Sequence, residues 1–168
     1  MSKPKIAGIS TGVILLAIIL GWMFTAPYLS NQGLGRLPGV IIGGTATSAP
    51  DDFSYLNDIP GPMKMKQAGF PELVVHLSFV GTQSGVISAT RPDNGYWGER
   101  VKERGGDGWL RVGDQTFEMT ATQVVDDNER LAMMEQWAAK SGRTLDEPLY
   151  TGSEPLREWE VYLWTPRS

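Results

Sequence analysis

The sequence contains no cysteine and only one histidine, His76. The lack of cysteine excludes disulfide bonds, thiolate metal sites, iron–sulfur clusters and covalently attached c-type haem. A single histidine cannot form a conventional metal site without carboxylate partners, so no metal site is expected. His76 stands among apolar residues, which favours a hydrogen-bonded histidine inside the fold. A haem ligand and a general base are the alternatives.

Basic residues are scattered, and the net charge of the chain is −4. No basic stripe runs through the sequence, so nucleic acid is not an expected partner. The nucleophile-elbow, P-loop, dinucleotide-binding glycine and zinc-protease motifs are all missing. No catalytic residue can therefore be assigned from a motif, and the catalytic residues stay unknown.

An uncharged, mostly apolar run covers Ile6–Phe24. About 20 apolar residues cross a bilayer as a helix, so this run predicts one N-terminal transmembrane helix with the lipid bilayer as a partner. Lys3 and Lys5 precede it. The positive-inside rule then places the N-terminus in the cytoplasm and the rest outside, in the periplasm if the source is Gram-negative. A cleaved signal peptide is the alternative, which Pro27 after the only plausible cleavage site disfavours.

The chain divides into three predicted segments. Residues 1–26 hold the cytoplasmic N-terminus and the anchor, and residues 72–168 form the folded core. Residues 27–71 are rich in proline and glycine and form a connector with a long loop. Within this connector we expect a first strand at Val40–Gly44 and a short helix near Lys64–Ala68.

Alternating apolar and polar residues in the core segment predict antiparallel strands. Gly113-Asp114 predicts a tight hairpin turn, and Asp126, with Glu129 three residues later, predicts a helix start. The expected fold class is α+β, mainly β, with one short and one longer amphipathic helix besides the transmembrane helix. The expected strands are Glu72–Val80, Val86–Thr90, Trp109–Val112, Thr116–Val125 and Glu158–Trp164, and the short helix lies between Pro92 and Gly106.

The order of these elements and several sequence motifs resemble the pyridoxamine-phosphate-oxidase-like superfamily. The resemblance covers roughly Leu73–Pro166, and its motifs are Ile87–Arg91, Tyr96–Arg100, Trp109–Phe117 and Ala121–Val124 with Asp127 and Arg130. Its deazaflavin-dependent, nitroreductase-like branch is the most similar. The resemblance implies a split β-barrel, a surface cleft for FMN or a deazaflavin, and a homodimer.

The resemblance also implies that hydroxyl and basic side chains at strand ends hold the cofactor phosphate. Ser84 lies in a turn, and Arg91 lies between a strand and a helix start, which suits an anion. Trp97 and Arg100 lie three residues apart on the short helix and would clamp a planar ligand. We therefore expect Ser84, Arg91, Trp97 and Arg100 to bind the cofactor. The alternatives are a salt bridge for Arg91 and packing on the barrel for Trp97.

Two functions follow as expectations. The first is a membrane-anchored flavin- or deazaflavin-type oxidoreductase that reduces a small or lipid-soluble acceptor. The second is a cofactor-free accessory subunit of a membrane protein complex. Six tryptophans favour the second function, as does the turn Gly81–Gly85, which lacks the cations of nitroreductase-like proteins. Whether the protein is an enzyme, and on what substrate, stays open.

Overall fold

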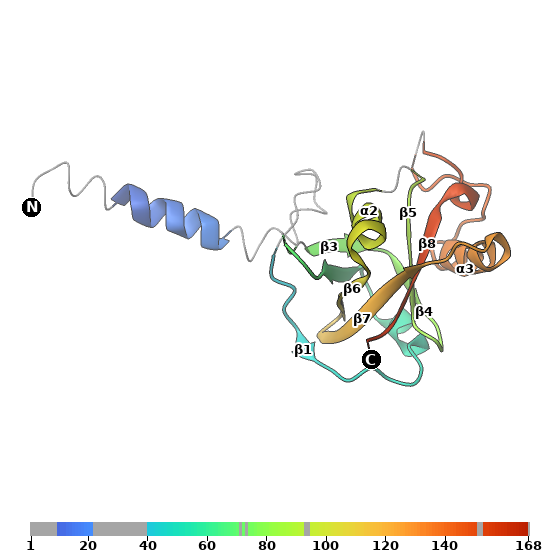
Figure 1. The fold of residues 1–168 in the computed structure, drawn as a ribbon, viewed down its shortest axis with the longest axis horizontal. Helices are drawn as coiled ribbons and strands as arrows, with labels where there is room; N and C mark the ends of the chain where they lie inside the picture. The colour runs from blue at the N-terminus through green and yellow to red at the C-terminus, as the bar shows by residue number, and fades with distance from the viewer. Residues whose placement is uncertain are drawn as a thin grey trace, which may run out of the picture.

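The structure is a computed structural model that describes residues 10–21, 40–70, 72, 74–92, 95–150 and 153–167. It shows a mainly-β domain built around one barrel-like sheet, with helices on its outside (Figure 1). This architecture is compatible with the expected split β-barrel.

The predicted transmembrane helix is wrong. Within the described residues, no helix is long and apolar enough to cross a bilayer. The N-terminal helix of the described chain covers only residues 10–21, and a helix of that length rises about 18 Å against the roughly 30 Å of a hydrocarbon core. The predicted single-pass localisation, with a cytoplasmic N-terminus and an extracytoplasmic domain, depended on this helix and is therefore not supported either. The ends of the predicted span, residues 6–9 and 22–24, lie outside the described residues, as does the connector over residues 27–39.

The sheet is nearly closed because one chain segment joins its two edges. The strand order is β3-β2-β6-β7-β8-β5-β4, and all the neighbours in this order are antiparallel. The two outermost strands, β3 (Val74–Leu77) and β4 (Phe79–Gly81), are separated only by Ser78. β3 pairs with β2 (Met63–Gln67), whereas β4 pairs with β5 (Val86–Thr90). The segment therefore changes partners at Ser78.

The other elements complete the sheet and cover it. The remaining strands are β1 (Thr45–Ala46), β6 (Asp107–Val112), β7 (Gln115–Gln123) and β8 (Glu160–Pro166). The helices are α2 (Gly95–Arg104) and α3 (Asp127–Lys140), with short 3₁₀ turns at η1 (Ser54–Asp58) and η2 (Leu156–Glu158).

Two apolar clusters hold the domain together. The first fills the barrel, where alternate residues of β2, β6 and β7 point inward and Met65, Leu110 and Phe117 have no exposed surface. The second lies between α3 and the outer side of β5 and β8, where Met134 and Trp137 are buried. Burial of large apolar side chains of this kind is the main source of stability in a domain of this size.

Several predicted elements are confirmed. β5 covers Val86–Thr90 as expected, and β6 and β7 pair through a two-residue turn at Gly113-Asp114. Gly113 has a φ of 58°, which suits such a turn. The Asp126 carboxylate accepts a hydrogen bond from the Glu129 backbone N–H and caps α3.

Two predictions in the connector are wrong. Val40–Gly44 forms no strand, and the strand nearest to it is β1. Lys64–Ala68 does not form a helix, because its residues belong mostly to β2, where Met63, Met65 and Gln67 are buried and the lysines between them are half-buried. Lysine, methionine, glutamine and alanine all favour helices when isolated, so the sheet on either side of β2 overrides local preference here.

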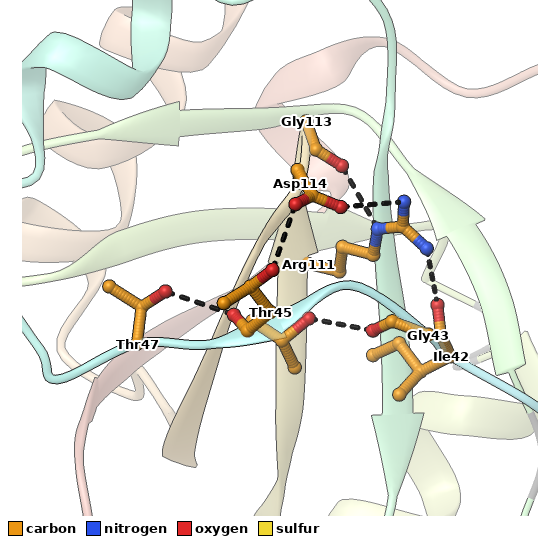
Figure 2. Close-up of polar contacts among 8 residues, drawn as sticks. Ile42, Gly43, Thr45, Thr47, Arg111, Gly113 and Asp114 are labelled. Carbon is orange, nitrogen blue, oxygen red and sulfur yellow. Dashed lines mark hydrogen bonds and ion pairs between the residues drawn. The ribbon is translucent and has the colours of Figure 1, made fainter.

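β1 is fixed to the start of β7 by the contacts drawn in Figure 2. Arg111 donates from Nη1 to the carbonyl of Ile42 at 3.0 Å, and the Thr45 hydroxyl donates to a carboxylate oxygen of Asp114 at 2.9 Å. Gly44 has a φ of +85°, and a Cβ there would lie 2.9 Å from Arg111 Nε. The positive φ and the close side chains of Thr116 and Arg111 together favour glycine at this position.

Candidate functional site

Ser84 and Arg91, two of the four predicted cofactor ligands, lie at opposite ends of β5. Ser84 is exposed in the turn before the strand, and Arg91 is half-buried just after it. At about 3.3 Å per residue, the two positions are separated by roughly 20 Å. A single phosphate group cannot contact both side chains.

Trp97 belongs to the barrel core. It is 8% exposed, and its ring centroid lies 4.8 Å from that of Tyr162 on β8. The Trp97 carbonyl also accepts a hydrogen bond from Gln67 Nε2 at 2.9 Å. The side chain therefore packs α2 against the barrel, which is the alternative given above for this residue.

Tyr162 is held in the same packing. Its hydroxyl lies 3.0 Å from a carboxylate oxygen of Glu160 and 3.3 Å from the carbonyl of Gly98, both of which accept hydrogen bonds. Burial, and then the nearby Glu160 carboxylate, raise the pKa of Tyr162 well above its usual value. The phenol is therefore neutral at physiological pH and acts as a donor under α2.

Arg100 fixes the chain that follows β2. It is 3% exposed, and its Nη2 donates to the carbonyls of Ala68 and Gly69, both at 3.3 Å. One turn later on α2, Arg104 Nη1 donates to the carbonyl of Phe70 at 2.9 Å. Two arginines of one helix thus hold three consecutive carbonyl groups, and we call Ala68–Phe70 the clamped loop.

The clamped loop presents one aromatic side chain to solvent. Phe70 is 90% exposed, although its backbone is held by Arg104. Isolated exposed apolar residues are common on protein surfaces, but here the Phe70 carbonyl is bonded to Arg104 and the two carbonyls before it to Arg100. The sequence pattern did not single out Phe70, because the residues that hold it lie more than 30 positions further along the chain.

His76, the remaining candidate, lies on β3 opposite Lys64 of β2. Burial, and then the positive charge of Lys64, lower the pKa of His76, so the imidazole is neutral at pH 7. A neutral imidazole is compatible with all three roles considered for His76, so its protonation state does not distinguish a core histidine from a haem ligand or a general base. In the described part of the chain, no three His, Cys, Asp or Glu side chains gather in a way that could hold a metal ion.

A cavity opens at the seam where the strand changes partners. Its volume is about 270 Å³, and it lies between the start of β2, Ser78 and the C-terminal end of α3. Trp137 Nε1 donates to the Ser78 carbonyl at 3.3 Å. The Ser78 carbonyl therefore has a hydrogen-bond partner although Ser78 lies between two strands and belongs to neither. The residues lining the cavity are Gly61, Pro62, Ser78, Phe79, Trp137, Lys140 and Ser141.

Lys140 brings a positive charge to this cavity. Its ammonium group lies 3.8 Å from the centroid of the Phe79 ring and donates to Asn57 Oδ1 at 3.0 Å. Partial burial lowers the pKa of Lys140, and the more distant Asp58 acts in the opposite direction. The sequence could not indicate this arrangement, since Lys140 and Asn57 are 83 positions apart.

Comparison with known proteins adds no family to this description: no family model and no curated protein matches the chain.

Proposed function

We propose that the domain is a cofactor-free accessory subunit that binds a partner protein. The observation that carries this proposal is the position of Arg100. A residue expected to grip a cofactor is instead buried and holds the clamped loop, from which Phe70 projects into solvent. Trp97, its expected companion, packs in the barrel core.

A fixed aromatic side chain is well suited to protein recognition. Aromatic residues are enriched among the side chains that dominate binding energies. Holding the backbone in place beforehand reduces the entropy lost on binding. The hydrogen bonds of Arg100 and Arg104 to the loop supply this preorganisation. The partner surface that fits is an apolar pocket able to take one phenyl ring.

The flavin- or deazaflavin-type oxidoreductase stays a prediction based on the resemblance. The barrel-like sheet supports it at the level of fold. The four residues expected to hold the cofactor do not support it, because two lie at opposite ends of β5 and two are committed to packing around α2. No catalytic step is therefore derived for this domain.

Phe70→Ala is expected to weaken partner binding by at least about tenfold, the loss typical of an aromatic anchor. The immobilised full-length protein would be incubated with an extract of its own organism, and partners retained at fixed stoichiometry would be quantified. Because Phe70 is exposed, its substitution should change the free energy of unfolding by less than about 0.5 kcal/mol.

Val125→Ala is the matched control, since Val125 is 82% exposed but lies outside the clamped loop. It should retain the partner as the unmodified protein does. An isolated monomer that captures no partner, or a partner bound equally well by Phe70→Ala, would contradict the proposal.

A further inference from the structure

The cavity at Ser78 combines a positive charge with aromatic walls. Phe79 and Trp137 are the aromatic residues of the lining, and Ser78 and Ser141 are part of it as well. The Ser141 hydroxyl donates to the Trp137 carbonyl at 3.0 Å, so this part of the wall is tied to α3. Small-molecule sites typically place a small number of polar groups among aromatic side chains.

Besides burial, which lowers the pKa of Lys140, Asp58 acts on its charge through space and raises the pKa, but it forms no ion pair with Lys140. Within the described residues Lys140 forms no ion pair, and its hydrogen-bond acceptor is the neutral amide oxygen of Asn57. That oxygen also accepts from the Gly81 N–H at 2.8 Å. A partly buried ammonium group is stabilised when an anion joins it, because burial removes part of its hydration.

The rim of the cavity is preformed. Pro62 has a fixed φ and precedes β2 directly. Gly61 has a φ of +94°, which makes the turn into this strand. On the opposite side, Trp137 is 3% exposed and bonded to Ser78. A ligand would therefore enter without reordering the surrounding backbone.

We propose that this cavity binds a small carboxylate that carries one planar apolar ring, with Lys140 as its counter-ion. The volume of about 270 Å³ suits a ligand of this size rather than a nucleotide or a flavin. The ring lies among the residues that line the cavity, and the carboxylate pairs with the ammonium group of Lys140. This site is separate from the clamped loop and does not depend on the proposed function.

The test is a calorimetric titration of the full-length protein with benzoate and with benzamide, its neutral counterpart. Benzoate should bind, and benzamide should bind at least about tenfold more weakly, because it lacks the charge that pairs with Lys140. Lys140→Gln should weaken benzoate binding by at least about tenfold and remove the preference for benzoate over benzamide.

Lys102→Gln serves as the control, because Lys102 lies on α2 and pairs with Glu160 at 2.8 Å, outside the cavity lining. It should leave benzoate binding unchanged. Lys140→Arg keeps the charge and should retain the preference for benzoate. The proposal is overturned if benzoate does not bind at millimolar concentration, or if Lys140→Gln binds it as well as the unmodified protein.

Discussion

Trp97→Ala is expected to lower the free energy of unfolding by about 3–5 kcal/mol. Trp97 is 8% exposed and packs against Tyr162 in the barrel core. Its removal would leave a large cavity between α2 and the barrel, and neighbouring side chains would collapse into it only in part. Urea unfolding followed by circular dichroism measures the change.

Trp109→Ala provides the matched comparison. Trp109 lies half-buried on β6, with Lys66 and Arg167 at 5.5 and 5.2 Å from its ring centroid. The loss there should be about 1–2 kcal/mol, because only part of the Trp109 side chain is buried and cation–aromatic contacts near the surface contribute little. A loss at Trp97 no larger than the loss at Trp109 would contradict the structural role of Trp97 and restore it as a ligand-binding candidate.

Gly106→Ala is expected to destabilise the domain by about 3 kcal/mol. Gly106 is buried where the chain leaves α2, and its carbonyl accepts a hydrogen bond from the Ala121 N–H at 2.9 Å. A Cβ at this position would overlap the backbone of Ala121 on β7. Since backbone atoms of a paired strand cannot move aside locally, the substitution would push α2 and β7 apart.

The control for this prediction is Gly12→Ala. Gly12 lies in the helix at residues 10–21, where an added Cβ would meet nothing within 4 Å. Alanine favours helices over glycine by about 1 kcal/mol, so no destabilisation is expected. The two variants would be compared by thermal unfolding. Equal stability of Gly106→Ala and the unmodified protein would mean that the backbones at Gly106 and Ala121 are not in close contact.

Local sequence signals predict correctly those elements whose structure depends only on neighbouring residues. The turn at Gly113-Asp114, the cap at Asp126 and the alternating strand β7 rest on chemistry within a few positions. β2 is predicted as a helix because its residues favour helices locally, although Met63 to Lys66 alternate as in a strand; pairing with β3 and β6 decides the outcome. The apolar run at residues 6–24 satisfied a composition rule, but the described helix covers only residues 10–21.

The site predictions depended on which face of α2 is buried, and spacing alone does not decide this. Trp97 and Arg100 share a face, as their separation of three residues requires. That face turns inward because Tyr162, 64 positions after Gly98, lies beneath the helix. The clamped loop and the cavity at Ser78 likewise join segments far apart in the sequence, such as Trp137 and Ser78, which are 59 positions apart.

The absorbance spectrum of the full-length protein, purified from its own organism and then titrated with FMN and a deazaflavin, tests the central claim most directly. The claim is that Trp97 and Arg100 maintain the fold and that the domain works without a redox cofactor. It predicts the absorbance of tryptophan and tyrosine alone, with no spectral change on either addition. A flavin, deazaflavin or haem band at near-stoichiometric level would contradict it.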